Sequence, residues 1–149
     1  MKKLLPQANS LNTVIDVFIY VSTMPNWTLN DVAEFCHFNV RQSSYYINAC
    51  YYIGLLNEDG SLSEEGKAIL SEPSSIKKKV YERVISDPLI SKVFAKLLVE
   101  GEKGLKEFTN KILALEYPDY SEAVIERRSS TLINWCFEIK CYIKQETKF

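Results

Sequence analysis

A thirteen-residue pattern occurs twice in this 149-residue chain, and the fold must accommodate both copies. The segment at 41–53 reads Arg-Gln-Ser-Ser-Tyr-Tyr-Ile-Asn-Ala-Cys-Tyr-Tyr-Ile, and the segment at 127–139 reads Arg-Arg-Ser-Ser-Thr-Leu-Ile-Asn-Trp-Cys-Phe-Glu-Ile. Seven residues keep their places at a constant shift of 86 positions. Because the apolar residues recur at helical spacing, the chain is predicted to contain two copies of one helical unit. Two copies are too few for a solenoid, which normally needs at least three units.

Length and composition indicate a folded protein made of one ordinary domain or two small ones. Apolar residues make up 46% of the chain, enough for a core, and charged residues make up 25%, enough for a hydrated surface. No apolar stretch approaches the roughly 18 residues of a membrane span, and the first residues lack the apolar run of a signal peptide. We therefore expect a cytoplasmic protein that does not contact a membrane.

Capping residues and apolar spacing predict a mainly α fold in the first half of the chain. Ser10, Thr28 (or Asn30) and Asn39 are suitable N-caps. The helices expected here run from residue 11 to before the proline at 25, over 29–36, over 40–53 and over 63–70. Between the last two, residues 55–63 contain two short apolar stubs around an Asp-Gly turn, which is typical of a β-hairpin. This hairpin is predicted to form a wing.

The break in composition at Pro73-Ser-Ser predicts a module boundary near Ser74. The second half is predicted to contain helices over 76–85, over 89–99 after an Asp87 N-cap and a proline at the first helical position, over 105–115, and from 121 to about 144. We therefore expect two modules, a winged helix-turn-helix module at 1–73 and a helical module at 74–149. The second would contain a helix-turn-helix-like unit and pack on the first, giving tandem helix-turn-helix units.

The two modules differ in charge, which matters for any anionic partner. Residues 1–73 carry four basic and eight acidic side chains, whereas residues 74–149 carry fourteen basic and eleven acidic ones. Four of the acids, Glu58, Asp59, Glu64 and Glu65, surround the predicted wing. Since a DNA-binding face is normally basic, the wing is expected to avoid phosphate.

The order of elements in the first module has a further implication. A capped helix, a short turn and a second helix are followed by Gly-Leu-Leu at 54–56, a polar hairpin and Leu-Ser-Glu-Glu-Gly-Lys at 62–67. This order resembles a winged helix-turn-helix DNA-binding domain. The segment at 120–135 is similar to one found in winged-helix regions of restriction-modification proteins. The resemblance implies binding of double-stranded DNA, although winged helices also serve as protein-interaction modules.

In a helix-turn-helix the second helix lies in the major groove with its N-terminal residues against base edges. Placing the apolar residues of each repeated helix inward turns a set of polar residues outward. Arg pairs with guanine, Gln or Asn pairs with adenine, and hydroxyl groups reach phosphates. The candidate DNA-binding residues are Arg41, Gln42, Ser44, Tyr45 and Asn48 in the first copy, Arg127, Arg128, Ser130, Thr131 and Asn134 in the second, and Lys77, Lys78 and Lys79, which would contact phosphates.

Simpler roles stay open for these residues. For Arg41 and Arg127, the alternative is a solvent-exposed side chain on the first turn of a helix, or an ion pair with a neighbouring acid such as Glu126. The lysine run at 77–79 fits a solvated helix face. The two Tyr-Tyr pairs at 45–46 and 51–52 fit a protein core as well as a stacking surface for bases or an aromatic protein interface.

The sequence gives little sign of catalysis or metal binding. Its one histidine, His37, lies beside Cys36, but a structural zinc usually needs four ligands at short spacings. Adjacent positions on a helix diverge by roughly 100°, so these two residues do not form a nucleophile and its base. No phosphate-binding loop or nucleophile elbow occurs. We expect no cofactor, no metal and no enzymatic activity, and we expect the four cysteines to be thiols that act as small apolar side chains.

The function that best fits these observations is double-stranded DNA binding, as a transcriptional regulator or as the recognition module of a DNA-processing system such as restriction-modification. The alternative is a protein-interaction module, or an inhibitor encoded by a phage or mobile element, that uses the same scaffold without DNA binding. A monomer with internal pseudo-symmetry is favoured over a homodimer that pairs through the last helix.

Overall fold

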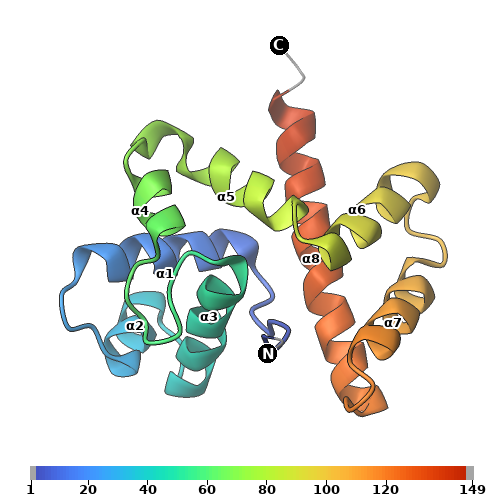
Figure 1. Ribbon diagram of the computed structural model, residues 1–149, viewed down its shortest axis with the longest axis horizontal. Helices are drawn as coiled ribbons and strands as arrows, with labels where there is room; N and C mark the ends of the chain where they lie inside the picture. Colours follow the sequence, from blue (N-terminus) through green and yellow to red (C-terminus); the bar gives the residue numbers. More distant parts are fainter. Residues whose placement is uncertain (1–2, 147–149) are drawn as a thin grey trace. The chain divides into compact units, whose positions relative to one another are not determined.

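The structure is a computed structural model that describes residues 3–146. The described residues form eight α-helices and one short 3-10 helix (Figure 1). They are α1 (Leu11–Thr23), α2 (Leu29–Cys36), α3 (Val40–Ile53), α4 (Glu64–Leu70), η1 (Pro73–Ser75), α5 (Ile76–Ile85), α6 (Pro88–Glu100), α7 (Leu105–Glu116) and α8 (Glu122–Glu146). None of the helices in this part of the chain has both the length and the apolar character needed to cross a membrane.

The chain divides into two compact units, and the division falls inside α5, between Val80 and Tyr81. Unit 1 contains α1 to α4 and the start of α5. Unit 2 contains the end of α5 and the helices α6 to α8. The assignment of 1–73 and 74–149 as two domains stays a prediction.

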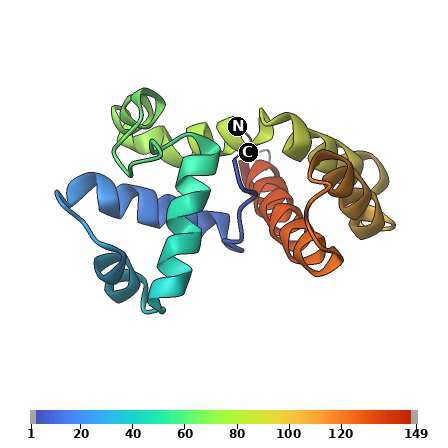
Figure 2. The ribbon, with the colours of Figure 1, turned by 60° about the horizontal axis from the view of Figure 1, so that its bottom comes forward.

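In unit 1, α3 packs against both α1 and α2 (Figure 2). The predicted N-caps are confirmed: the side chains of Ser10, Thr28 and Asn39 each accept a hydrogen bond from a backbone N–H in the first turn of α1, α2 and α3. The buried apolar face of α1, including Phe18, supplies much of the core of this unit. The helices therefore begin where local capping chemistry places them.

In unit 2, α6, α7 and α8 pack pairwise against one another. The Asp87 carboxylate accepts hydrogen bonds from the backbone N–H groups of Leu89 and Ile90, which confirms it as the N-cap of α6. Burial occurs around most of the circumference of α8 near its middle, where Leu132, Ile133 and Trp135 are all buried. The core of unit 2 is thus built around α8.

The predicted β-hairpin wing is wrong, because residues 3–146 contain no strand. Residues 55–63 make a single antiparallel bridge between Leu56 and Leu62. The turn between Leu56 and Leu62 is closed by the side chains of Asn57 and Asp59, which form hydrogen bonds with Ser61 and Leu62. A second strand has no room to extend, because the very next residue is the N-cap of α4.

The prediction of tandem helix-turn-helix units is also wrong. In unit 1 three residues, 37–39, connect α2 to α3, which is the connection length of a helix-turn-helix. In unit 2 the five residues at 117–121 connect α7 to α8, and the Tyr117 and Tyr120 rings stack there with centroids 4.8 Å apart. The second copy therefore retains the repeated helix and lacks the tight turn.

The repeated pattern nevertheless has the same inward face in both units. Ser43 and Ser129 are equivalent and fully buried, as are Cys50 and Cys136. Neither serine hydroxyl has a hydrogen-bond partner in the part of the chain that the structure describes. The shared sequence thus encodes a buried face with small side chains at matching positions.

Candidate nucleic-acid interface

The turn between α2 and α3 fixes how α3 begins. Thr28 and Asp31 form a reciprocal capping box at the start of α2, in which the Asp31 carboxylate accepts a hydrogen bond from the Thr28 N–H at 2.8 Å. His37 ends α2 in the left-handed conformation, with φ 59°. The Asn39 side chain then accepts a hydrogen bond from the Gln42 N–H at 2.9 Å. Each helix therefore begins at a side-chain cap, and the left-handed His37 ends α2 at the three-residue turn.

The first turns of α3 present polar side chains to solvent. Arg41, Gln42 and Ser44 are exposed, as the sequence predicts, whereas Ser43 and Tyr46 are buried. Among the described residues, Arg41 forms no ion pair. Three side chains with hydrogen-bonding capacity thus lie together at the N-terminal end of α3, where the helix dipole favours anions.

Tyr45 orients the guanidinium group of Arg41. The Arg41 Nε donates a hydrogen bond to the Tyr45 hydroxyl at 2.8 Å, and the guanidinium carbon lies 5.9 Å from the centre of the tyrosine ring. A bond made through Nε leaves the terminal amino groups of the guanidinium for an incoming partner. Tyr45 is half-buried and so acts here mainly on Arg41. Side chains four residues apart lie together on a helix, so the sequence spacing alone could have indicated the contact between Arg41 and Tyr45.

Asn48 is turned away from the other candidates. It is half-buried, and its Nδ2 donates a long hydrogen bond, at 3.5 Å, to the backbone carbonyl of Leu4. Of the five candidates on α3, the exposed group is therefore Arg41, Gln42 and Ser44. We call these three residues the α3 tip.

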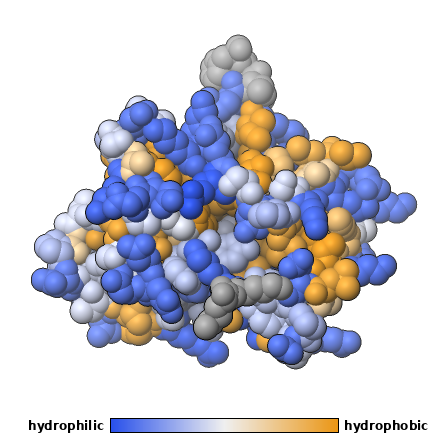
Figure 3. Space-filling view, in the orientation of Figure 1, coloured by the Kyte–Doolittle hydropathy of each residue, from blue (hydrophilic) through white to orange (hydrophobic). Residues whose placement is uncertain are grey.

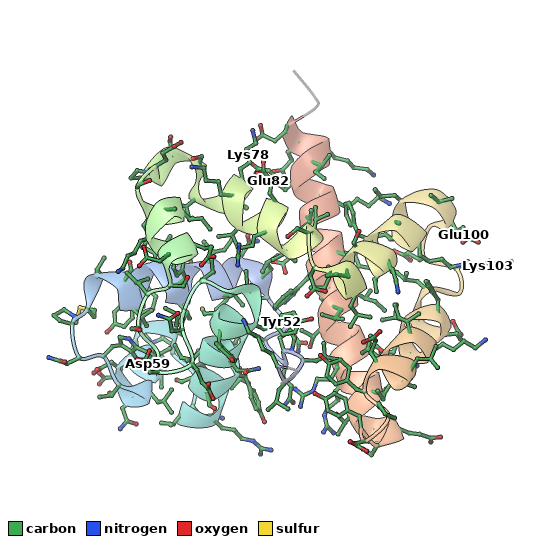
Figure 4. All side chains as sticks on the ribbon, viewed as in Figure 1. Tyr52, Asp59, Lys78, Glu82, Glu100 and Lys103 are labelled. Carbon is green, nitrogen blue, oxygen red and sulfur yellow. The ribbon has the colours of Figure 1, made fainter. Side chains whose placement is uncertain are left out.

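The three lysines of α5 lie away from the α3 tip. Figures 1 and 2 show the start of α5 at the opposite end of α3 from its first turn, and Figure 4 places Lys78 there. Lys77 and Lys78 are exposed, while the Lys79 ammonium forms an ion pair with Glu72 at 3.1 Å. Hydrogen bonding and charge attraction from Lys79 lower the pKa of Glu72. The structure thus does not bring these lysines together with the α3 tip.

The candidates on α8 are divided between surface and core. Arg127 and Asn134 are exposed, and Arg128 is half-buried with its guanidinium carbon 5.8 Å from the Tyr120 ring centre. The predicted outward orientation of Thr131 is wrong, because this residue is only 1% exposed. The orientation fails because α8 is buried around more of its circumference at this point than α3 is at the equivalent positions.

Ser130 belongs to a polar network between α7 and α8 that the sequence did not indicate. The Lys106 ammonium donates hydrogen bonds to the Ser130 hydroxyl and to the backbone carbonyl of Glu126, and it pairs with the Glu126 carboxylate at 3.1 Å. The Asn110 side-chain amide donates to the other Glu126 oxygen at 3.1 Å. The Ser130 hydroxyl therefore links α8 to α7 through its hydrogen bond with Lys106.

This network is expected to make the stability of the protein sensitive to acid. Hydrogen bonds from Lys106 and Asn110 lower the pKa of Glu126. Since the folded-state pKa is lower than the unfolded one, the stabilisation is present above the usual glutamate pKa and is lost as pH falls through the lowered value. We expect Glu126→Gln to lower the melting temperature at pH 7, and we expect the difference from wild type to shrink at about pH 3. Thermal melts at both pH values measure this, and an unchanged difference would contradict it.

The described residues do not point to a reactive centre. No group of three or more His, Cys, Asp or Glu side chains within residues 3–146 is placed to hold a metal ion. Burial raises the pKa of Cys50, and it raises the pKa of Cys136 to about 12, so both thiols stay protonated. Cys36 also has a raised pKa, caused first by burial and then by the charge of Asp16. A raised pKa lowers the thiolate fraction on which cysteine reactivity depends.

Comparison with known proteins gives a family and no function. Residues 13–141 match the model of a family described as a domain of unknown function, DUF7226. No curated protein matches the chain significantly, and no solved structure does. The match begins in α1 and ends in α8, so one family model covers both copies of the repeat. The chain therefore belongs to the DUF7226 family.

Proposed function

We propose that this protein binds double-stranded DNA through the α3 tip. The observation that carries the proposal is the exposure of Arg41, Gln42 and Ser44 together on the first turns of a helix that follows α2 by only three residues. A helix presented in this way enters the major groove by its N-terminal end. The bound duplex would therefore meet the α3 tip before any other part of unit 1.

The chemistry of the α3 tip fits reading of base edges and phosphates. The terminal amino groups of Arg41 match O6 and N7 of guanine, and the Gln42 amide matches N6 and N7 of adenine. The Ser44 hydroxyl and the N-terminal end of α3 suit a phosphate oxygen. One bidentate arginine contact supplies about 1–3 kcal/mol of discrimination, so sequence preference is expected to be modest.

The low density of positive charge around α3 limits affinity. Residues 4–40 contain no lysine or arginine, so unit 1 offers few cations to phosphates near the α3 tip. Since phosphate contacts supply most non-specific affinity, we expect dissociation constants of about 10⁻⁴–10⁻⁶ M on random duplex. The protein is then best suited to act as a regulator or as the recognition module of a larger DNA-processing system, such as restriction-modification, in the cytoplasm.

Arg41→Ala tests the proposal, with Lys78→Ala as the matched control. Both changes remove one exposed cation from unit 1, Arg41 in the first turn of α3 and Lys78 on α5, away from the α3 tip. Loss of the arginine contact is expected to weaken binding roughly 5- to 150-fold on the preferred sequence, which corresponds to about 1–3 kcal/mol. The control change is expected to have a small effect. Fluorescence anisotropy of a labelled duplex measures both.

The outcome against the proposal is equal weakening by the two variants, because that would mean binding through charge alone. Absence of binding by the wild-type protein at about 50 mM salt, where phosphate contacts are strongest, would favour the alternative function, a protein-interaction module. An exposed surface on α1 and α2 supports that alternative independently.

A further inference from the structure

We propose that unit 1 has a second interaction surface, on α1 and α2, that binds a cationic amphipathic helix of a partner protein. The surface consists of Asp16, Ile19 and Tyr20 on α1 and of Glu34 and Phe35 on α2, and we call it the α1–α2 surface. None of these residues belongs to the α3 tip. The two proposals therefore rest on different side chains and can fail separately.

An aromatic pair lies at the centre of the α1–α2 surface. The rings of Tyr20 and Phe35 stack with centroids 4.3 Å apart and an angle of 17° between their planes. Phe35 nevertheless stays 47% exposed, and Ile19, which lies three residues after the exposed Asp16 on the same face of α1, is 36% exposed. The two helices thus present a shared apolar face that the rest of unit 1 does not cover.

Exposed apolar side chains in unit 1 are concentrated in one stretch of sequence. Within the described part of unit 1, every large hydrophobic side chain that is exposed belongs to the segment from residue 4 to residue 40. They are Leu4, Ile19, Met24, Leu29, Phe35 and Val40. Figure 3 shows apolar areas set among hydrophilic ones over α1 to α3. Single exposed apolar residues are ordinary on protein surfaces, whereas Phe35 is exposed as one member of a stacked ring pair.

The negative charge of residues 4–40 indicates that a partner binding here would be positively charged. Residues 4–40 contain no lysine or arginine, whereas they contain Asp16, Asp31 and Glu34. Asp16 and Glu34 are exposed, and Asp31 is half-buried. Asp16 precedes Tyr20 by four residues, so the two side chains lie on the same face of α1. The α1–α2 surface therefore combines exposed apolar side chains with two exposed carboxylates, Asp16 and Glu34, which we call its acidic rim.

A cationic amphipathic helix is complementary to this arrangement. Its apolar side chains, spaced three and four residues apart, would lie against Ile19, Tyr20 and Phe35. Its lysines and arginines would pair with Asp16 and Glu34 or lie over the exposed face of the aromatic pair. DNA and anionic membranes carry the same sign of charge as the rim, so neither fits.

Binding of a designed peptide to the full chain tests this inference. The probe is a fluorescein-labelled peptide of about 18 residues, five helical turns, that contains only leucine and lysine at amphipathic spacing. Asp16→Lys combined with Glu34→Lys reverses the rim. Glu58→Lys combined with Glu65→Lys is the matched control, because it changes net charge equally at exposed sites outside the surface. Anisotropy titrations give the affinities.

We expect the rim reversal to weaken peptide binding roughly tenfold or more, because attractive charges become repulsive, and we expect the control pair to change it by less than about twofold. Amide chemical shift changes in the wild-type protein should centre on Ile19, Tyr20 and Phe35. A scrambled peptide of the same composition and a peptide with glutamate in place of lysine should bind poorly.

Any of the following results would overturn the inference. They are absence of peptide binding, equal weakening by the two double variants, and shift changes centred away from α1 and α2. Binding of the glutamate peptide as tightly as the lysine peptide would also overturn it, because the surface would then select for apolar character alone. DNA binding measured on the same variants reports on the α3 tip separately, since the tip lacks the reversed residues.

Discussion

Replacing Trp135 with alanine is expected to cost about 3–5 kcal/mol of unfolding free energy, the usual range for truncation of a large buried aromatic side chain. Trp135 is 0% exposed and is among the largest fully buried side chains of the described chain. It lies in the middle of α8, on which both α6 and α7 pack. Removal of the indole leaves a cavity that the surrounding side chains fill only in part.

Urea denaturation followed by circular dichroism measures this loss. Trp135→Phe keeps an aromatic ring and is expected to cost less. The chain has two tryptophans, so in Trp135→Ala the remaining Trp27 reports on unit 1 by fluorescence. A loss of less than about 1 kcal/mol would contradict the packing of unit 2 described above, because truncation of an exposed or loosely packed residue has effects of that size.

Gly66→Ala is expected to destabilise unit 1, although alanine is the better helix former. Within a helix, alanine is favoured over glycine by about 1 kcal/mol. A Cβ atom on Gly66 would however lie 2.2 Å from the backbone carbonyl oxygen of Leu55 and 3.3 Å from the Phe18 ring. A backbone carbonyl cannot rotate aside as a flexible side chain can. The clash therefore outweighs the propensity, and we expect a net loss of about 1–3 kcal/mol or more.

Lys67→Ala is the control for Gly66→Ala, because Lys67 is the next residue of α4 and is exposed. It is expected to change stability little. Thermal or urea unfolding of both variants measures the difference. Stabilisation by Gly66→Ala would show that α4 does not approach the Leu55 backbone as closely as the structure indicates.

Helix starts could be predicted from the sequence because capping is local. The side chains of Ser10, Thr28, Asn39 and Asp87 bond to backbone groups two or three residues away, so the residue type alone indicates the position. The inward face of each repeated helix could be predicted for the same reason, since it depends only on spacing.

The prediction of a wing was wrong because two local signals, one for a hairpin and one for a helix start, lie too close together for both structures to form. The Asp-Gly turn at 59–60 favours a hairpin, whereas Ser63 favours a helix start immediately after it. The Ser63 hydroxyl accepts a hydrogen bond from the Gly66 N–H at 2.9 Å, and α4 begins there. The helix cap prevails, and the hairpin is reduced to one bridge.

The candidate site was predicted in part. Exposure of Arg41, Gln42 and Ser44 follows from the helical period. The burial of Thr131 does not, because it depends on how much of the circumference of α8 is covered by other parts of the chain, which only tertiary packing decides. The hydrogen bond between Lys106 and Ser130 likewise joins residues 24 positions apart, so no local sequence pattern indicates it.

Titration of a duplex of about 30 base pairs into the isotopically labelled protein, followed by amide chemical shifts at about 50 and 200 mM salt, tests DNA binding most directly. We expect shift changes centred on Arg41, Gln42 and Ser44, smaller at the higher salt and absent from the lysines at 77–79. Shift changes confined to α1 and α2, or no change at the lower salt, would contradict binding of DNA by the α3 tip.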